Sequence, residues 1–406
     1  MINPLDCGLS YKIKIRRILK VKLRRVLALI FAAAMVLAIV ACGGNDAPPP
    51  VASDPAPAPA PEEPAPAPAP DPIPEAEGVK IGISMPTMSL QRWNQDGANL
   101  QMGLEAAGFE VDLQFGGENE VPVQIAQLEN MIAAGVDVLV IAAIDGGALT
   151  EVLGQAKEKG ISVIAYDRLI MNTDAVTYYA TFDNWQVGVL QGKFLEDELN
   201  LKAGGGPYNI EFFTGDPGDN NINFFFGGAM EVLQPYLDSG VLVCPSGQTD
   251  IMQVATIAWD PANAQARMEN LIATYGYGPT GTPLHAVMCS NDSTAQGVST
   301  ALQGAGFTAD NFPLITGQDC DIVSVRNMLD GYQAMSVFKD TRTLAANVVE
   351  MVKAIVAGTE VPVNDLETYD NGTGIIPSNL SVPVFGDINN WRELLIDSGY
   401  YSEDEI

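Results

Sequence analysis

Short β-branched apolar runs alternate with helix-length segments along most of this chain, and this alternation limits its fold more than any other feature. A first series has predicted strands at 79–85, 110–115, 137–144, 161–166 and 176–181, with helices near 95–107, 123–134 and 148–159. A second series has helices near 186–199, 223–237, 262–275 and 294–305, with strands at 207–213, 241–243, 284–289, 312–316 and 333–338. Alternating strands and helices are typical of parallel sheets. The sequence therefore predicts an α/β fold of two similar units in tandem, with a cleft between them.

Three further elements follow the second series. A strong helix is predicted at 341–357, an extended, turn-rich segment at 361–384, and a final amphipathic helix near 388–397. Periodicity alone does not assign these elements to either unit.

The N-terminal residues have the layout of a secretion signal. Basic residues within 12–25 precede an uncharged run of 16 residues, 26–41, which is slightly short for a membrane-spanning helix and suits a signal core. Cys42 follows small and branched apolar residues, as in the lipobox of bacterial lipoproteins. We therefore expect 1–42 to be a lipoprotein signal with lipidation at Cys42, and an uncleaved membrane anchor is the alternative. Residues 43–77 are rich in Pro and Ala, which predicts a disordered, extended stalk.

Charge and cysteine content exclude several classes of partner. The net charge of −29 at pH 7 argues against nucleic acid, whose phosphates attract a basic surface. Cys7 and Cys42 belong to the signal, which leaves Cys244, Cys289 and Cys320 in the body of the chain. These three have no CxxC spacing, so neither a metal nor a redox motif is predicted. Cys289 and Cys320 both lie near predicted strand ends and are candidate neighbours, but the sequence does not show a bond.

Common enzyme signatures are missing. His285 is the only histidine and lies within an apolar strand, which removes histidine-based acid–base chemistry. No glycine-rich nucleotide fingerprint is present, and 219–230 opens like a calcium loop but carries Phe224 where that loop needs Gly. We therefore expect no cofactor and no metal. Asp216 and Asp219 allow a glycosidase-like carboxylate pair in principle, although turn propensity explains them equally well.

Polar and aromatic residues follow the ends of the predicted strands. They are Arg92, Trp93, Asp145, Asp167, Arg168, Asp219, Asn221, Trp259, Asn291, Asp319 and Lys339. Ligands of open α/β sheets bind in the crevice outside the carboxyl ends of the strands, so we expect these side chains to meet in one cleft. Three basic residues nearly cancel three of the aspartates, which favours a neutral polyhydroxyl ligand that charged groups can hydrogen-bond. Trp93 and Trp259, from opposite units, suit the apolar faces of a sugar ring.

Each of these residues also has an ordinary structural explanation. Trp93 and Trp259 suit a hydrophobic core, because tryptophan is usually largely buried. Asp167 and Arg168 suit a surface ion pair. Three others precede predicted helices and suit N-caps, namely Asp219, Asn221 and Asn291. The joint pattern is what favours a binding site.

Eight short segments occur in the order seen in a known family. They are Met85-Pro86-Thr87 with Arg92-Trp93, Val163-Ile164-Ala165-Tyr166-Asp167-Arg168, Tyr179-Ala180-Thr181-Phe182-Asp183-Asn184, Asp219-Asn220-Asn221, Trp259-Asp260-Pro261, Ser290-Asn291-Asp292, Gly317-Gln318-Asp319 and Phe338-Lys339-Asp340. On these residues the chain resembles the periplasmic sugar-binding proteins of the ribose, galactose and xylose group, and within it the multiple-sugar-binding receptors. The resemblance covers nearly all of 79–406, whereas the lipobox and stalk depart from the simple periplasmic signal of that group.

The resemblance implies the type I periplasmic binding fold, in which two Rossmann-like lobes with parallel sheets are joined by a three-segment hinge. It places the crossovers near 182–184, near 338–340 and within 361–371. The N-terminal lobe would then comprise 78–182 with about 340–365, and the C-terminal lobe 183–339 with about 366–406. The sugar contacts of the family map onto the strand-end residues given above, except Asp145.

The resemblance also implies a function. The protein would be a monomeric, extracytoplasmic receptor. The lipobox, which departs from the family, adds the expectation that lipid on Cys42 holds it to the outer face of the cell membrane. It would bind an aldopentose or aldohexose without converting it, and the closed form would deliver the sugar to an ABC permease. The alternatives are a sensor that reports a sugar or an autoinducer to a chemoreceptor or histidine kinase, and a carbohydrate-active enzyme.

Overall fold

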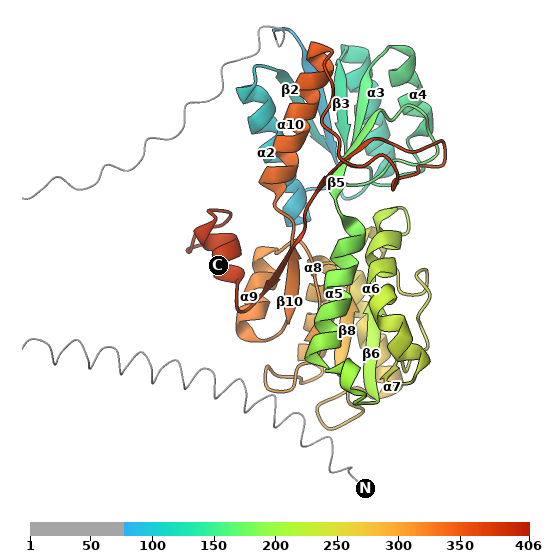
Figure 1. Cartoon of the computed structure of the whole chain (residues 1–406), viewed down its shortest axis with the longest axis vertical. Helices are drawn as coiled ribbons and strands as arrows, with labels where there is room; N and C mark the ends of the chain where they lie inside the picture. Colours follow the sequence, from blue (N-terminus) through green and yellow to red (C-terminus); the bar gives the residue numbers. More distant parts are fainter. Residues whose placement is uncertain (1–76) are drawn as a thin grey trace, which may run out of the picture. The chain divides into compact units, whose positions relative to one another are not determined.

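A computed structural model describes residues 77–406 of the chain (Figure 1). The predicted secretion signal, the lipobox at Cys42 and nearly all of the predicted stalk lie outside the described residues. Within 77–406, no helix combines the length and the apolar character needed to span a membrane.

The first lobe contains a six-stranded parallel sheet in the order β11-β5-β4-β3-β1-β2 (Figure 1). Its strands are β1 (Lys80–Met85), β2 (Glu110–Phe115), β3 (Val138–Ile141), β4 (Ser162–Tyr166), β5 (Tyr178–Phe182) and β11 (Ser378–Ser381). One face is covered by α2 (Gln91–Ala106) and α10 (Thr341–Ala357), and the other by α3 (Val121–Ala134) and α4 (Thr150–Glu158). Because both faces are covered, the central strands are apolar throughout, as in the fully buried Val-Leu-Val-Ile of β3.

The second lobe repeats this layered arrangement on a smaller sheet in the order β7-β6-β8-β9. Its strands are β6 (Tyr208–Phe213), β7 (Leu242–Val243), β8 (Ala286–Cys289) and β9 (Leu314–Ile315). One face packs against α5 (Asn184–Glu198) and α6 (Asn221–Asp238), and the other against α7 (Pro261–Tyr275) and α8 (Asp292–Gly304). The remaining elements are η2 (Leu201–Ala203), η3 (Ile257–Trp259), α9 (Ile322–Asp330), the antiparallel pair β10 (Met335–Phe338) and β12 (Val384–Asp387), and the π-helix η4 (Arg392–Asp397). The predicted α/β fold with parallel sheets is confirmed.

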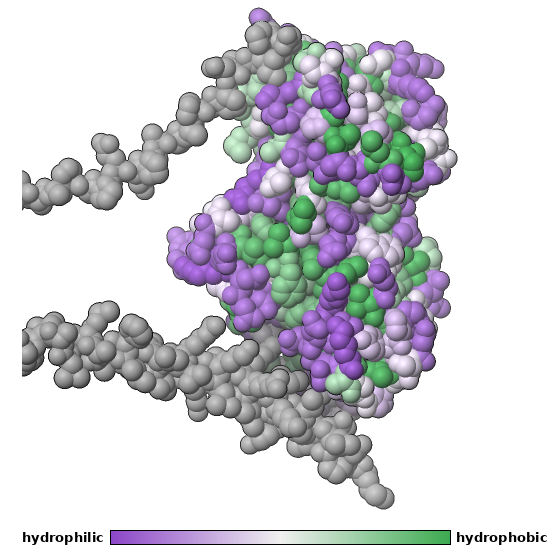
Figure 2. All heavy atoms as spheres, in the orientation of Figure 1, coloured by the Kyte–Doolittle hydropathy of each residue, from purple (hydrophilic) through white to green (hydrophobic). Residues whose placement is uncertain are grey.

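Three crossovers connect the lobes. The chain passes from β5 to α5 at Asp183, from β10 to α10 at 339–340, and from β11 to β12 at 382–383. We call 79–182 with 341–381 the N-lobe and 184–339 with 384–406 the C-lobe. Figure 2 shows hydrophobic residues near the middle of the face where the lobes join, and Val382 in the third crossover is 79% exposed.

The third crossover lies later in the chain than the 361–371 expected from the resemblance. Val361 and Tyr369 are buried in N-lobe cores, and the Asn371 amide donates to the carbonyl oxygens of Ile170 and Thr173. The chain then adds β11 as an edge strand beside β5. The N-lobe therefore extends to Ser381 rather than to about 365. The sequence hides this boundary because the strand, Ser-Asn-Leu-Ser, lacks an apolar pattern.

Two other features differ from the expectations. Helix α9 was not predicted, because its first residues, Ile-Val-Ser-Val, are mostly β-branched and favour a strand. The loop before it has positive φ angles of 96° at Asp319 and 54° at Cys320. The candidate neighbours Cys289 and Cys320 are both free thiols, as is Cys244, so none of the three cysteines in the described part of the chain forms a disulfide.

Candidate binding site between the two lobes

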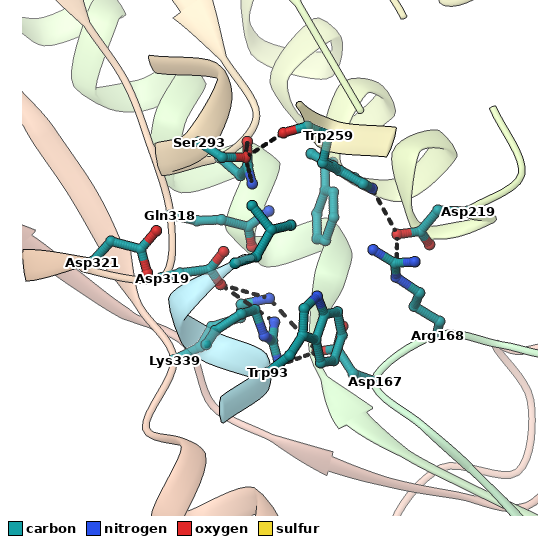
Figure 3. Close-up of a pocket in the computed structure, with 14 residues that line it drawn as sticks. Trp93, Asp167, Arg168, Asp219, Trp259, Ser293, Gln318, Asp319, Asp321 and Lys339 are labelled. Carbon is teal, nitrogen blue, oxygen red and sulfur yellow. Dashed lines mark hydrogen bonds and ion pairs between the residues drawn. The ribbon is translucent and has the colours of Figure 1, made fainter. Parts of the chain in front are cut away.

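A polar pocket lies between the lobes (Figure 3). Its empty space, including the part open to solvent, is about 400 Å³. The N-lobe lines it with Leu90, Arg92, Trp93, Asp167 and Arg168. The C-lobe lines it with Asp219, Phe225, Trp259, Asn291, Ser293, Gln318, Asp319, Asp321 and Lys339. Most of these residues lie at the ends of strands or the starts of helices in both lobes. This is expected for a ligand site outside the carboxyl ends of parallel strands.

Asp167 is the charged centre of the N-lobe wall. It follows β4 directly and has a left-handed φ of 57°, which turns its side chain out of the sheet. Its Oδ2 lies 3.0 Å from Arg92 Nη2 and 3.6 Å from Lys339 Nζ. Burial alone would raise the pKa of this carboxyl, but the cations of Arg92, Lys339 and Arg168 outweigh burial and lower it. Asp167 therefore stays ionised in the pocket.

The first turn of α2 presents Arg92 and Trp93 to the pocket. Asp96, one turn later, accepts from Arg92 Nε at 3.0 Å and is itself fully buried. Tyr166 Oη donates to the same carboxylate, so Arg92 is held from behind by two residues that do not line the pocket. Burial raises the pKa of Asp96 to about 6, although Arg92 opposes the shift. Arg92 Nη1 also reaches Asp319 Oδ1 across the lobes at 3.3 Å.

Trp259 forms part of the C-lobe wall through a strained backbone. Both Ala258 and Trp259 have positive φ angles, 58° and 56°. Asp216 accepts from the Ala258 N–H, and the Trp259 carbonyl accepts from Ser293 Oγ at 2.8 Å. Trp259 Nε1 donates to Asp219 Oδ2 at 3.2 Å. Beneath the ring lies Gly215, where an added Cβ would come within 1.9 Å of ring atoms. The indole is therefore fixed in position before any ligand binds.

The loop that carries Gln318, Asp319 and Asp321 is fastened by a buried carboxylate. Asp292 accepts from Gln333 Nε2 at 2.9 Å, from Ser336 Oγ at 2.8 Å and from the Asp321 backbone N–H at 2.8 Å. These bonds hold the positive φ of Asp319, whose Oδ1 lies 3.1 Å from Lys339 Nζ. Because Asp292 itself does not line the pocket, its role is to position the loop.

The charges of the pocket nearly balance. Arg168 Nε pairs with Asp219 Oδ2 at 3.0 Å, while Arg92 and Lys339 share Asp167 and Asp319. Asp321 is the remaining carboxyl of the lining, and burial, with a contribution from Asp319, raises its pKa to about 7. Three cations therefore face four carboxyl groups, of which Asp321 is partly protonated near neutral pH.

Three buried polar atoms of the lining have neither a hydrogen-bond partner nor an ion-pair partner in the protein. They are the donor Trp93 Nε1 and the acceptors Gln318 Oε1 and Asp321 Oδ1. Most buried polar groups in proteins are hydrogen-bonded, so these atoms mark positions where a ligand with both donors and acceptors would bind. Hydroxyl groups provide both.

The structure brings nine of the eleven candidate residues to the pocket lining and leaves two outside it. Asn221 is buried beside the pocket, where its Nδ2 donates to the Asp167 carbonyl at 2.7 Å and its Oδ1 accepts from Tyr179 Oη at 3.1 Å. Asp145 accepts from the Gly147 N–H at 2.8 Å. Asn291 has both predicted roles, because it lines the pocket and caps α8 through Thr294 N at 3.0 Å.

Sequence reasoning missed five residues of the lining, namely Leu90, Phe225, Ser293, Gln318 and Asp321. All but Phe225 lie within two positions of a residue that was proposed, so extending each strand-end motif by two residues would have found them. Phe225 lies in the middle of an apolar run of α6 and has no polar signal. Lys339 Nζ lies 5.6 Å from the centre of its ring.

Comparison with known proteins gives concordant results. Residues 81–360 match the family described as periplasmic binding protein domain. The multiple sugar-binding periplasmic protein SbpA of Azospirillum brasilense is 50% identical over 80% of this chain and 90% of its own length. The multiple sugar-binding periplasmic receptor ChvE of Rhizobium radiobacter is 48% identical over 80% of this chain and 92% of its own length. A crystal structure of an ABC transporter solute binding protein from Clostridium phytofermentans with bound β-D-glucose is 59% identical, with a TM-score of 0.78 over 80% of this chain and 99% of that one.

Proposed function

Because the chain belongs to the periplasmic binding protein family, we propose that it is a receptor that binds one monosaccharide between its lobes. The type I fold and the family resemblance seen in the sequence are both confirmed. The finer statements, which concern the sugar, the membrane anchor and the partner, are part of the proposal.

The composition of the pocket carries this proposal. Its walls combine two tryptophan rings from opposite lobes, ion pairs of balanced charge, and buried polar atoms that lack a partner. A sugar ring has apolar C–H faces that suit Trp93 and Trp259 and hydroxyl groups that suit the donors and acceptors between them. An anionic ligand would need a positive excess that these residues do not provide. A neutral polyol in ring form meets all three conditions.

D-Glucose is the first ligand to test. The similar solute binding protein from Clostridium phytofermentans has bound β-D-glucose, and the similar receptors of Azospirillum and Rhizobium are named for multiple sugars. The proposal covers aldopentoses as well as aldohexoses, because the contacts that tell them apart depend on the placement of single hydroxyl groups.

Isothermal titration calorimetry of the full chain with D-glucose, D-galactose, D-xylose and L-arabinose tests the binding. We expect saturable binding of at least one aldose at micromolar concentration or tighter, with a stoichiometry of one. The absence of binding to every aldose would contradict the proposal. Recovery of the sugar unchanged, followed by NMR during prolonged incubation, separates a receptor from a carbohydrate-active enzyme.

We place the protein outside the cytoplasmic membrane, anchored through lipid on Cys42, where it delivers sugar to an ABC importer. The family, and the similarity to an ABC transporter solute binding protein from Clostridium phytofermentans, support delivery to an importer. Incorporation of a labelled fatty acid should be lost in Cys42→Ser. Loss of sugar uptake on deletion of the protein supports transport, whereas normal uptake combined with lost chemotaxis toward the sugar supports the sensor alternative.

A further inference from the structure

Among the hydrogen bonds that join the lobes, we compare two sets that lie near opposite ends of the pocket. One set, the Asn221 clasp, consists of the two bonds of the Asn221 side chain to the N-lobe and a backbone bond from Gly146 N–H to Gly218 O at 2.9 Å. It lies beside Asp219, whose Oδ1 accepts from the Asn221 backbone N–H at 3.0 Å. Asp219 and Arg168 form the end of the pocket on the right of Figure 3. The other set lies next to the opposite end, beside Asp321.

We call this second set the Gln91 clasp. Gln91, the first residue of α2, donates from Nε2 to Tyr401 Oη at 2.7 Å and accepts from the Ile322 N–H at 3.0 Å. Tyr401 Oη in turn donates to the Cys320 carbonyl at 3.0 Å. Gln91 thus makes two bonds from the N-lobe to the C-lobe, and none of these residues lines the pocket.

The bond to Ile322 replaces a missing helix cap. The first N–H groups of a helix have no partner within the helix, and a side chain at the N-cap usually accepts from them. Asp321, the N-cap of α9, makes no such bond, and its Oδ1 remains without a partner on the pocket wall. Gln91 from the other lobe takes over the capping and leaves Asp321 available to a ligand.

The C-terminal end of the clasp is a rigid part of the C-lobe. Tyr401 is 3% exposed and packs with Val325, Met328 and Leu395 in one apolar cluster. Figure 1 shows the C-terminal segment beside α9. The Tyr401 hydroxyl is therefore held in place for Gln91, and both bonds of Gln91 must break when the lobes separate.

We propose that the Gln91 clasp sets the ligand affinity of the pocket by stabilising the closed arrangement of the lobes. The proposal rests on the function given above. Arg92 and Asp321, which line opposite walls of the pocket, are the sequence neighbours of the two bonded residues Gln91 and Ile322. The apparent dissociation constant equals the intrinsic one divided by the closed fraction, so losing the clasp weakens binding without touching the ligand.

The test compares Gln91→Ala with Gln101→Ala in the full chain. Gln101 lies on the same helix, and its side chain bonds only Glu105 in that helix. Losing two interlobe bonds should raise the dissociation constant for D-glucose about 25-fold, because one net hydrogen bond corresponds to roughly a fivefold change. Tyr401→Phe, which keeps the buried ring, should raise the dissociation constant for D-glucose about three- to fivefold. Its control is Tyr236→Phe, whose hydroxyl bonds Glu196 within the C-lobe.

A second measurement separates opening of the lobes from local damage. Hydrogen exchange of the Gly146 amide in the sugar-free protein reports on the Asn221 clasp, at the far end of the pocket. Gln91→Ala should speed this exchange several-fold, and saturating D-glucose should slow it again. Exchange equal to that of Gln101→Ala would overturn the proposal, as would faster exchange with an unchanged dissociation constant. If no variant and no wild-type sample binds any aldose, the proposed function fails, but exchange at Gly146 still decides whether the clasp holds the lobes.

Discussion

Replacement of Gly215 by alanine should displace Trp259 into the pocket. The added Cβ would lie 1.9 Å from the ring, and ordinary contact begins near 3.4 Å, so the indole has to move by about 1.5 Å. That movement breaks the 3.2 Å bond from Trp259 Nε1 to Asp219. Because the displaced ring occupies space in the pocket and no longer lies flat against a bound sugar, binding should weaken by about tenfold or more. Loss of the bond to Asp219 should lower the free energy of unfolding by about 1.5–3 kcal/mol. Overpacking should also lower the free energy of unfolding by about 1–3 kcal/mol.

Calorimetry with the best-bound aldose and urea denaturation measure these two effects separately. Gly154→Ala is a matched control, because an added Cβ at that helical position meets nothing within 4 Å. We expect this control to bind normally and to be at least as stable as the wild type. If Gly215→Ala binds the sugar within twofold of the wild type and remains folded, then the position of Trp259 does not determine affinity.

Three further results are expected. Trp93→Ala should weaken sugar binding at least tenfold with an unchanged circular dichroism spectrum, whereas replacement of Trp185, 42% exposed and outside the pocket, should leave the calorimetric affinity unchanged. Because burial raises the pKa of Asp321 to about 7 and ligand hydroxyls donate best to the ionised form, affinity should fall as the pH drops from 8 to 6, and this fall should be absent in Asp321→Asn. Because burial raises the pKa of Asp96 to about 6, the folded state binds this proton more tightly than the unfolded chain, so stability should decrease as the pH rises from 4 to 6, by roughly 2 kcal/mol from this group. Urea denaturation of Asp96→Asn at both pH values should lack that part of the decrease, and an identical pH slope in the two proteins would refute the assignment.

Much of the fold was predictable because its strands are buried on both faces. A strand such as β4, Ser-Val-Ile-Ala-Tyr, leaves a continuous apolar run that ends abruptly at Asp167 and Arg168. The same rule located most of the pocket, since parallel strands present their carboxyl ends at one edge. Both inferences use local sequence alone. They therefore predicted the elements whose residues are buried uniformly along their length.

The parts that could not be predicted depend on contacts between distant segments. The polar strand β11 is held by its pairing with β5, and the nearby Asn371 is held by carbonyl groups about 200 positions earlier in the chain. Asn221 resembled a ligand contact in sequence, yet its amide spans the lobes, because the helix it begins points its first turn at Asp167 O. Periodicity carries no information about such pairings.

The late addition of β11 has a consequence for the order in which the protein is made. The four-stranded sheet of the C-lobe lies entirely within 208–315, whereas the N-lobe sheet needs a strand from 378–381 and a covering helix from 341–357. The ribosome therefore completes the second lobe's sheet before it has supplied the last strand of the first, which reverses the usual order of folding. Until then β5 remains an unpaired edge. The last pairing of the first lobe's sheet therefore waits until almost the whole chain has been synthesised.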